Sequence, residues 1–471
     1  MDIQLGELLT TPGGLLSFYG NKELLTARPA GVVIDSREVK GGEIFFALKG
    51  EQTDGHYFVK SALEKGALAA VVNNWWYQSE GEKIEAGNFL VTSDSLLALQ
   101  ETAHFYRSKF FIPLLAITGT TGKTTAKEMT YEVLSRKFSV LKSKGNLNNH
   151  IGVPLTLFEL NQTYNIALVE MGTNHFGEIR RLTEIARPNY GLITNIGKGH
   201  LEFFGSIEGV ARAKMELFES LGPEDTAFVN ADDELIVQKM PPLKRVIHFS
   251  LKKQAEVKGE LLGMDRFGRA RFRVQNTEIN LGISGVHHVY NALAAIAIGL
   301  EFGVDLASMK SALEDFRPYS KRMEIIEKQG VMIINDSYNS NPDSLRAALT
   351  VLSQMEVSGR RIAVLADMLE LGESALAEHR QMGQLILELG IDYLLAYGPL
   401  ATAAVDEVKK SEPKRAFHFQ DKGELKDQLI KMLQPGDVVL VKGSRGMAME
   451  GVVEEIITAL SPIPDNRGES G

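Results

Sequence analysis

A stretch rich in glycine and threonine has the composition and spacing of a phosphate-binding loop. Residues 118–125 read TGTTGKTT, directly after a predicted strand and before a predicted helix. Backbone N–H groups of such a turn bind phosphate oxygens, because they are unpaired and the helix dipole favours anions. The Lys123 ammonium can neutralise terminal phosphates, and the Thr124 hydroxyl can ligate Mg²⁺. A turn that only caps a helix is the simpler interpretation, and the strand, the helix and the GKTT ending together argue against it.

The spacing of this loop narrows the class of protein. The common P-loop has a glycine five residues before the position of Gly122, and this chain has Ile117 there. The shorter G-x-x-G-K-T form weighs against an ordinary GTPase or motor ATPase.

Two further polar residues follow predicted strands of the same segment. Glu170 ends a strand in ALVEMGTNH, and His200 follows the strand 191–195 in NIGKGHLEFFGS. The carboxyl ends of parallel strands share one edge of a sheet, where α/β proteins bind ligands. We expect Glu170 to contact Mg²⁺ rather than only to cap a helix. For His200, a metal ligand and a structural histidine are equally good interpretations.

Other motifs are less specific. Lys214 lies in the predicted helix VARAKMELF and, taken alone, is a solvated helix lysine. Asn148 and Asn149, in GNLNNH, form either a helix N-cap cluster or a polar wall for a substrate. In the last third of the chain, Asp336 and the KGSR sequence 442–445 follow predicted strands. Basic KGSR suits an anionic ligand, and a turn with solvated charges is the alternative.

The elements that must position these motifs indicate an α/β protein of three domains. Residues 1–92 form a small αβ domain, and 93–317 alternate strands with helices, which favours a mostly parallel sheet covered on both faces. Residues 257–283 break this rhythm and suggest antiparallel hairpins. After the linker RPYSKR the αβ rhythm resumes in a Rossmann-like domain, 318–471. The predicted strands are 32–35, 44–48, 69–72, 111–117, 166–170, 191–195, 331–334, 362–366, 393–396 and 438–441, and 78–87 is predicted as a surface loop.

Composition excludes several classes of protein. With 471 residues, about 100–200 per domain gives three domains. Subtracting 60 acidic from 51 basic residues gives a net charge of −9, which argues against a sequence-independent nucleic-acid binder. The absence of cysteine excludes disulfides, thiolate catalysis and cysteine-bound metals. No signal peptide or membrane-spanning run is evident, so we expect a cytoplasmic protein without membrane insertion.

Several blocks in the right order resemble the Mur ligase family over nearly the whole chain. They are ITGTTGKTT, GNLNNHIGVPLTL, VEMGTNHFGEI, GHLEFFGS with ARAKMELF, HHVYNALAA, NDSYNSNPDS, DMLELG and VKGSRGMAME. The N-terminal block IDSREVKGGEIFFALKG resembles the nucleotide-sugar-binding segment of two family members. GNLNN-x-IG-x-P, DSYN-x-N and KGSR resemble the signatures of the branch that adds D-alanyl-D-alanine. The DNPR and KGHE blocks of the branch that adds the third residue are absent.

The resemblance implies an ADP-forming amide ligase of peptidoglycan precursor synthesis. It would join D-alanyl-D-alanine to UDP-N-acetylmuramoyl-tripeptide through an acyl phosphate, with ATP and two Mg²⁺ ions as cofactors. Residues 1–92 would bind the UDP substrate, 93–317 would bind ATP, and 318–471 would complete the ATP and dipeptide sites. We expect a monomer.

The resemblance also assigns residue roles, position by position. Lys123, His200 and Lys214 would be catalytic, and Lys214 would carry a carbamate that gives the metal a carboxylate ligand. The other metal ligands would be Thr124, Glu170 and His200. The ATP site would comprise Gly119, Thr120, Thr121, Gly122, Lys123, Thr124, Thr125, Asn291 at the adenine, and Arg322 and Asp336 for phosphate and ribose. Ser36 and Arg37 would meet the uridine diphosphate, and Asn148, Asn149, Lys442, Ser444 and Arg445 the rest of the substrates.

Three positions depart from the family pattern, and two other functions stay open. Lys321 and Ala366 replace usual glycines, and Gly199 replaces a usual alanine. A folylpolyglutamate-type or another Mur-type ligase shares the loop, although the former gives no reason for the IDSR block. A nucleotide-dependent switch protein also fits the P-loop, and it would form no amide product.

Overall fold

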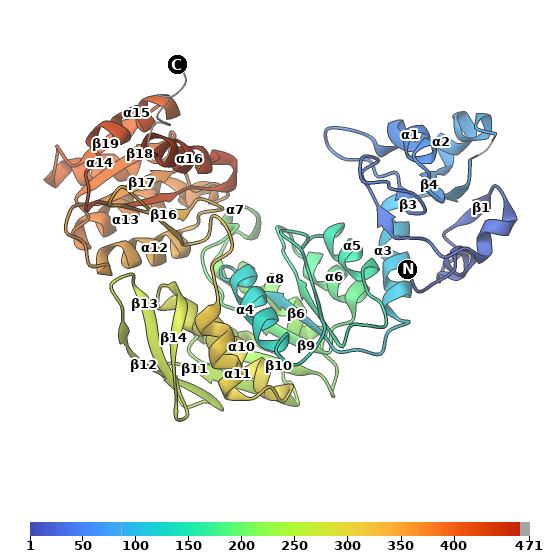
Figure 1. Ribbon diagram of the computed structural model, residues 1–471, viewed down its shortest axis with the longest axis horizontal. Helices are drawn as coiled ribbons and strands as arrows, with labels where there is room; N and C mark the ends of the chain where they lie inside the picture. The colour runs from blue at the N-terminus through green and yellow to red at the C-terminus, as the bar shows by residue number, and fades with distance from the viewer. Residues whose placement is uncertain (86, 462–471) are drawn as a thin grey trace, which may run out of the picture.

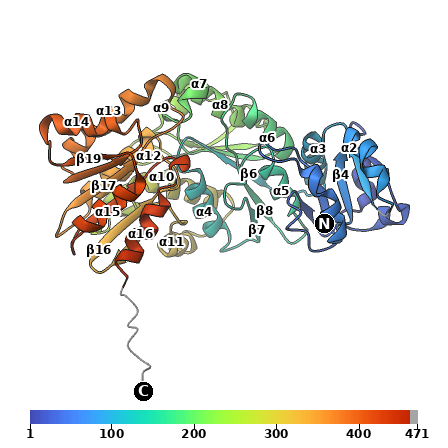
Figure 2. The same ribbon diagram turned by 90° about the horizontal axis from the view of Figure 1, so that it is seen from above.

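The computed structural model describes residues 1–85 and 87–461, which contain three sheets of five, nine and six strands. The chain passes through them in order. In Figure 1 the first domain (blue) lies at one end, the central domain (cyan to yellow) below, and the third domain (orange to red) at the other end. Figure 2 shows the third domain packed against the central one, with the first domain at the far side of the central domain.

The first sheet has the order β1-β5-β4-β3-β2, with β1 antiparallel to β5 and the other pairs parallel. Helix α3 follows β5 and leads into the central domain, and Asp94 caps its N-terminus through Leu96 N and Leu97 N. The prediction of a surface loop over 78–87 is wrong in part, because 81–83 form a 3₁₀ turn; residue 86 lies outside the described residues. The elements are β1 (Ser17–Tyr19), β2 (Val32–Val33), β3 (Ile44–Phe46), α1 (Val59–Glu64), β4 (Ala69–Asn73), α2 (Asn74–Ser79), β5 (Phe89–Thr92) and α3 (Ser95–Arg107).

The central sheet has the order β14-β13-β12-β11-β10-β9-β6-β8-β7. It is parallel from β7 to β12. The antiparallel strands β12–β14 extend one edge, as predicted from the interruption of the strand–helix alternation at 257–283. Its strands are β6 (Leu114–Thr118), β7 (Val140–Lys142), β8 (Ile166–Glu170), β9 (Tyr190–Ile193), β10 (Thr226–Asn230), β11 (Arg245–Ser250), β12 (Val257–Met264), β13 (Arg269–Val274) and β14 (Thr277–Ser284). Its helices are α4 (Lys123–Leu134), α5 (Gly152–Phe158), α6 (Glu178–Ala186), α7 (Leu201–Phe204), α8 (Ile207–Glu219), α9 (Glu234–Lys239), α10 (His287–Glu301) and α11 (Leu306–Asp315).

Strand β6 shows why this sheet is covered on both faces. Successive strand residues point to opposite faces, so a fully apolar strand must pack on both. Leu115 and Ile117 belong to the core shared with α4 and α10, whereas Leu114 and Ala116 belong to the core shared with α3, α5 and α8. The predicted start of this strand is wrong: β6 begins after Pro113, and Phe111 is 99% exposed.

The third sheet has the order β15-β16-β20-β17-β18-β19 and is parallel except for β15. In its register Asp336 lies beside Lys442, and Lys442 beside Leu365, so the exits of β16, β20 and β17 form one edge. The strands are β15 (Glu324–Lys328), β16 (Val331–Asp336), β17 (Arg361–Ala366), β18 (Tyr393–Tyr397), β19 (Ala416–Phe419) and β20 (Val438–Lys442). The helices are α12 (Pro342–Gln354), α13 (Ala375–Glu388), α14 (Thr402–Ser411), α15 (Lys422–Met432) and α16 (Glu450–Ala459).

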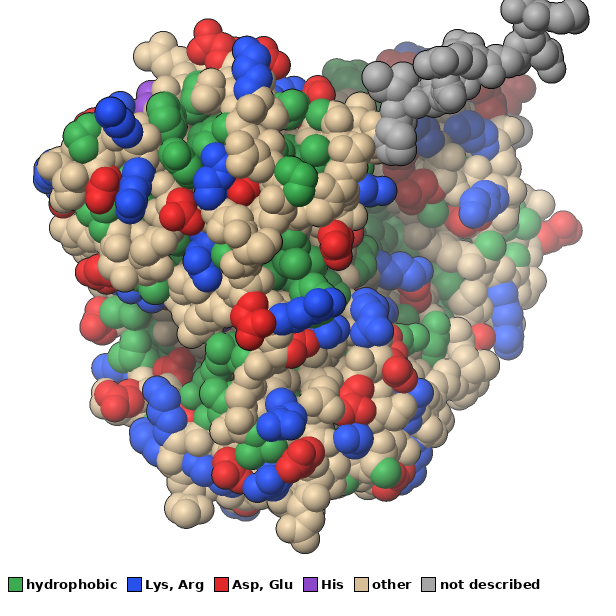
Figure 3. Space-filling model, turned by 60° about the vertical axis from the view of Figure 1, so that its left-hand side comes forward, with side chains coloured by type: hydrophobic (Ala, Val, Ile, Leu, Met, Phe, Trp, Pro, Cys, Tyr) green, Lys and Arg blue, Asp and Glu red, His purple; other side chains and the backbone are tan. Residues whose placement is uncertain are grey.

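The surface carries charges of both signs. On the face shown in Figure 3, basic and acidic side chains are interspersed, and apolar side chains gather mainly in the hollow between the upper and lower parts of the molecule. Among the residues that the structure describes, no helix is long and apolar enough to cross a membrane.

Candidate active site

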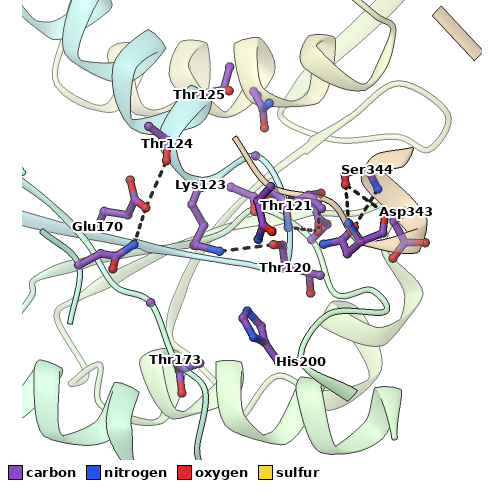
Figure 4. Close-up of a pocket in the computed structure, with 18 of the residues that line it drawn as sticks. Thr120, Thr121, Lys123, Thr124, Thr125, Glu170, Thr173, His200, Asp343 and Ser344 are labelled. Atoms are coloured by element: carbon purple, nitrogen blue, oxygen red, sulfur yellow. Dashed lines mark hydrogen bonds between the residues drawn. The ribbon is translucent and has the colours of Figure 1, made fainter. Parts of the chain in front are cut away.

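The phosphate-binding loop joins β6 to α4 and faces a cavity of about 1130 Å³ between the central and third domains. Gly122 is the N-cap of α4 and has φ 80°, a left-handed conformation that favours glycine. A Cβ at Gly122 would lie 2.8 Å from Asn291 Oδ1, so the loop and α10 require this glycine. Residues Thr120 to Thr125 all line the cavity (Figure 4). The arrangement is that of an anion site at a helix N-terminus.

Polar groups after β9 fix the conformation of the loop. Asn195 Oδ1 accepts from Thr121 N at 3.0 Å, and Asn195 Nδ2 donates to Thr121 O at 3.0 Å. Thr194 Oγ1 also donates to Thr121 O, at 2.6 Å. Lys123 Nζ donates to Gly119 O at 2.8 Å, and burial lowers the pKa of Lys123. Side chains from the neighbouring strand exit and the lysine of the loop therefore hold its backbone in place.

Glu170 lies beside the loop, at the end of β8. Its Oε1 accepts from Asn148 Nδ2 at 2.9 Å and from Thr124 Oγ1 at 3.3 Å. Its Oε2 is buried without a hydrogen-bond partner among the described residues and lies 3.5 Å from Lys127 Nζ. A buried carboxylate oxygen without a partner next to a threonine hydroxyl is a suitable pair of ligands for a hard divalent cation.

The two asparagines have different partners. Asn149 Oδ1 accepts from Ile151 N and Gly152 N at the start of α5, which is the helix-capping alternative. Asn148 orients Glu170 instead, and both asparagines line the cavity. The helix-capping interpretation therefore holds for Asn149, and the substrate-wall interpretation stays a prediction.

Lys214 lies on α8 and is 2% exposed. In the described part of the chain, no hydrogen bond or ion pair to its ammonium is found. Burial, and then the charge of Lys123, hold the pKa of Lys214 well below its ordinary value. It does not line the cavity itself. The sequence interpretation of a solvated helix lysine is therefore wrong, because the side chain is inside the domain.

His200 lies where the central and third domains meet. It has φ 53° just before α7, lines the cavity, and its Nδ1 lies 2.6 Å from Glu370 Oε2 of the third domain. The two atoms are close, and Nδ1 makes no hydrogen bond of regular geometry within the described chain. The imidazole lowers the pKa of the Glu370 carboxyl.

The third domain brings Arg322, Asp336 and Lys442 to the same cavity. Lys442 Nζ donates to Asp336 Oδ2 and, at 2.8 Å, to Asn339 O. The Arg322 guanidinium lies 3.9 Å from the centre of the Tyr338 ring, and its buried Nε has no partner in the described chain. Arg322, just before β15, and the strand-end residues Asp336 and Lys442 give the cavity a second polar wall.

Four of the predicted substrate residues are not brought to this cavity. The Ser444 hydroxyl is buried and bridges backbone groups, accepting from Leu369 N and donating to Ser340 O. Arg445 pairs with Glu450 at 2.8 Å. Ser36 and Arg37 lie in the first domain, away from the lining of this cavity. Ser36 is buried, whereas Arg37 is exposed and bonded to Asp35.

Two departures from the family pattern have a structural explanation. Lys321 has φ 66° and Met323 φ 53°, so Arg322 lies between two left-handed residues. A glycine at 321 avoids the cost of about 1–2 kcal/mol that an L-residue meets there. Ala366 is buried at the end of β17, and its Cβ occupies the space beside Gly443.

The third departure, Gly199, is explained by Thr120. A Cβ at Gly199 would lie 2.7 Å from Thr120 Cγ2. We expect Gly199→Ala to destabilise the fold by about 1–3 kcal/mol through this overlap. Adding Thr120→Ser removes the methyl group, keeps the hydroxyl that accepts from Gly197 N, and should restore most of the loss. Thermal unfolding of both single variants and the double variant measures the coupling; additive effects would contradict the prediction.

Two adjacent histidines at the start of α10 predict a pH dependence of stability. Burial is the main cause that lowers the pKa of His287 to about 4 and the pKa of His288 well below its ordinary value. Between about pH 6.5 and pH 4 the unfolded chain then binds more protons than the folded one, so the free energy of unfolding falls as pH falls. His287→Gln should flatten this slope in denaturant titrations at several pH values. Equal slopes for the variant and the parent chain would refute the assignment.

Several residues of the site escaped the sequence analysis. Lys127 is fully buried on α4, donates to Ser143 O at 2.7 Å and neutralises Glu170. His288 bonds Asn291 at 3.1 Å and lines the cavity, and the block HHVYN was the only signal for it. Asp343 and Glu370 contact the central domain from the third, which no local pattern shows.

Family models match most of the chain. A Mur ligase middle domain matches residues 117–299, a Mur ligase glutamate ligase domain matches 321–445, and a Mur ligase family catalytic domain matches 29–103. Each matched range contains all or most of the strands of one sheet.

Curated relatives and solved structures agree with these matches. A UDP-N-acetylmuramoyl-tripeptide–D-alanyl-D-alanine ligase of Bacillus subtilis is 35% identical over 91% of this chain and 93% of its own length. The Escherichia coli protein of that name is 36% identical over 90% and 93%. A crystal structure of MurF from Acinetobacter baumannii is 31% identical, with a TM-score of 0.84 over 97% of this chain and 99% of that one. MurF from Thermotoga maritima in complex with ADP is 27% identical, with a TM-score of 0.79 over 91% and 97%.

Full-length relatives above 30% identity, three domain matches in order and the shared architecture lead to one conclusion: this chain belongs to the Mur ligase family.

Proposed function

We propose that the chain is an ATP-dependent ligase that joins D-alanyl-D-alanine to UDP-N-acetylmuramoyl-tripeptide in peptidoglycan precursor synthesis. One observation carries the proposal. A single cavity of about 1130 Å³ has the phosphate-binding loop and Glu170 on one wall, and Arg322, Asp336 and Lys442 of the third domain on the other. The relatives that bear the name of this activity align over nine-tenths of the chain.

We further propose limits and roles for the three domains. Residues 1–92 bind the UDP end of the substrate, with Ser36 and Arg37 contributing; 93–317 bind ATP; and 318–471 complete the ATP and dipeptide sites. Asn291 next to Gly122 and the pair Asp336–Lys442 support placing the nucleotide between the second and third domains. In this proposal Ser444 supports the dipeptide site through its hydrogen bonds to the backbone of Leu369 and Ser340. Arg445 and Lys442 supply the positive charge of the dipeptide site.

The residues present fit Mg²⁺. Thr124 Oγ1 and the partly unpartnered carboxylate of Glu170 are oxygen ligands 3.3 Å apart, and His200 lines the same cavity. Within the described residues no group of three or more His, Asp or Glu is arranged to hold a metal alone. This fits ions that are shared with phosphate oxygens, and we propose two of them. When bound, Mg²⁺ neutralises charge on the phosphates.

The chemistry requires activation of a carboxylate. A carboxylate oxygen of the tripeptide attacks the γ-phosphorus of ATP, the bond from that phosphorus to the β,γ-bridging oxygen breaks, and ADP leaves. Lys123 and the amides of the loop stabilise the charge of the transferring group. The neutral amine of D-alanyl-D-alanine then attacks the acyl phosphate, loses a proton, and expels inorganic phosphate.

We also propose that the Lys214 side chain is carbamylated. Its side chain is buried and has no hydrogen bond or ion pair to the residues that the structure describes, which favours the neutral amine, the form that attacks carbon dioxide. The new N–C bond forms with loss of one proton, and the product carries a carboxylate in place of a cation. Such a group supplies anionic oxygens that suit a hard cation.

Coupling of ADP release to both acceptor substrates tests the function. Purified protein with ATP, D-alanyl-D-alanine and UDP-N-acetylmuramoyl-tripeptide should release ADP and give one amide product by mass spectrometry. Omission of the dipeptide or of the nucleotide sugar should stop product formation. Equal ADP release without either substrate would favour the nucleotide-dependent switch. Parallel incubations with lysine- and diaminopimelate-containing tripeptides identify the third residue, and gel filtration and cell fractionation test the proposed cytoplasmic monomer.

A further inference from the structure

The contact between His200 and Glu370 joins two domains at the candidate metal site. His200 Nδ1 lies 2.6 Å from Glu370 Oε2, and Glu202 N donates to Glu370 O at 3.1 Å. A Cβ at Gly372 would lie 3.3 Å from the Cα of Glu202, so the two chain segments also approach closely. Figure 1 shows α7, which directly follows His200, beside the third domain. Both backbone and side chain of Glu370 therefore engage the residues around His200.

The loop that carries Glu370 is held firmly by its own domain. Met368 N donates to His379 Nε2 at 3.0 Å, and Leu369 N donates to Ser444 Oγ at 2.8 Å. Glu370 itself has φ 62°, a conformation that persists in a non-glycine residue only where the surroundings determine it. His200, with φ 53°, has the same property. A rigid loop thus presents a carboxylate to an imidazole that is also fixed in position.

The rest of the segment 197–200 meets the third domain through other acidic groups. Lys198 N donates to Asp343 Oδ2 at 2.6 Å, and Lys198 Nζ donates to Glu378 Oε1 at 2.6 Å. Thr120 of the phosphate-binding loop accepts from Gly197 N on the other side. These contacts bring the two domains together, and Glu370 is the acidic residue that lies against the histidine ring.

A histidine that ligates a metal is commonly oriented by a carboxylate on its second nitrogen, which fixes the tautomer and raises ligand basicity. We propose that Glu370 is a positioning residue of this kind for His200. Its Oε2 lies 2.6 Å from Nδ1, the nitrogen it would orient, and leaves Nε2 for the metal. Because Glu370 belongs to the third domain, the metal site is complete only when that domain is docked. The inference rests on the proposed role of His200 in metal binding.

Binding of Mn²⁺ tests the inference without measuring turnover. We would titrate Mn²⁺ into the full chain with a non-hydrolysable ATP analogue and follow free Mn²⁺ by electron paramagnetic resonance. Glu370→Ala should weaken Mn²⁺ binding by about 10–100-fold, the usual cost of losing an outer-sphere partner. Glu370→Gln keeps an oxygen that can accept from Nδ1 and should give a smaller loss. Circular dichroism melting establishes that each variant is folded.

Two further variants distinguish a loss of domain docking from a loss of His200 positioning, and both from a failure of the proposed metal role of His200. Glu378→Ala removes the carboxylate that accepts from Lys198 Nζ at the same interface and should leave Mn²⁺ affinity unchanged. A loss equal to that of Glu370→Ala would assign the effect to docking and overturn the inference. His200→Ala should weaken Mn²⁺ binding strongly. If it does so while the Glu370 variants bind normally, the positioning role is refuted. If His200→Ala also binds normally, the proposed metal role of His200 has failed instead.

Discussion

Lys123→Ala is expected to reduce ligation at least about a hundredfold while the protein stays folded. Lys123 is the cation of the phosphate-binding loop, and removal of one group that stabilises developing charge costs about 3–4 kcal/mol of activation free energy. Among the described residues its ammonium donates to the carbonyls of Gly119 and Thr120. Loss of these bonds should change the free energy of unfolding by about 1–2 kcal/mol. Steady-state ADP release and thermal melting measure the two effects separately.

A matched lysine variant controls for the loss of positive charge. Lys431→Ala removes an exposed lysine from α15, outside the lining of the cavity, and should leave both ligation and stability close to those of the parent chain. Turnover by folded Lys123→Ala at the rate of this control would contradict the assigned role.

Lys214→Ala is expected to be nearly inactive and to regain activity in part with acetate or formate. A lysine that is 2% exposed and has no carboxylate partner in the described chain would be costly as a cation, so the neutral amine is favoured. Its carbamate would act as a direct metal ligand, whose loss should exceed the roughly 10–100-fold cost of an outer-sphere partner. A small carboxylate can occupy the space that the shortened side chain leaves. Ligation rates with and without added formate measure the recovery.

Two controls make the Lys214 result specific. Glu208→Ala changes an exposed residue on the same helix and should keep full activity that formate does not alter. Native mass spectrometry of the parent chain should show the added mass of one carbon dioxide, absent from Lys214→Ala. Full activity of Lys214→Ala, or an unmodified ammonium in a high-resolution density map, would eliminate the carbamate.

The sequence by itself determined those features that depend on neighbouring residues. The loop 118–125 forms its anion site from eight consecutive residues at a strand-to-helix junction, so its motif was sufficient. The alternation of strands and helices indicated parallel sheets, and the strand-exit rule then placed Glu170, Asp336 and Lys442 at ligand-binding edges. The interruption of the strand–helix alternation at 257–283 likewise predicted the antiparallel hairpins.

An error arose where an element boundary decides the outcome, and the direction of a side chain also could not be predicted. Phe111 belongs to an apolar run that looks like part of a strand, but Pro113 precedes the true start and leaves the ring in solvent. Ser444 shares the KGSR motif with Lys442, yet its hydroxyl turns inward to backbone groups. Lys442 ends β20, whereas Ser444 lies beyond the strand at the start of the 3₁₀ turn 445–447, so the alternation of the strand does not set the direction of its side chain.

Only the tertiary structure decided which distant residues meet. His200 and Glu370 are 170 positions apart and come from different domains, and each has an ordinary local sequence. Lys214 was interpreted as solvated because helix periodicity predicts on which face of the helix a residue lies, but not which other elements cover that face. In the folded domain its side chain is buried. Such contacts depend on how sheets, helices and whole domains pack against one another, and short-range patterns in a chain contain no information on that packing.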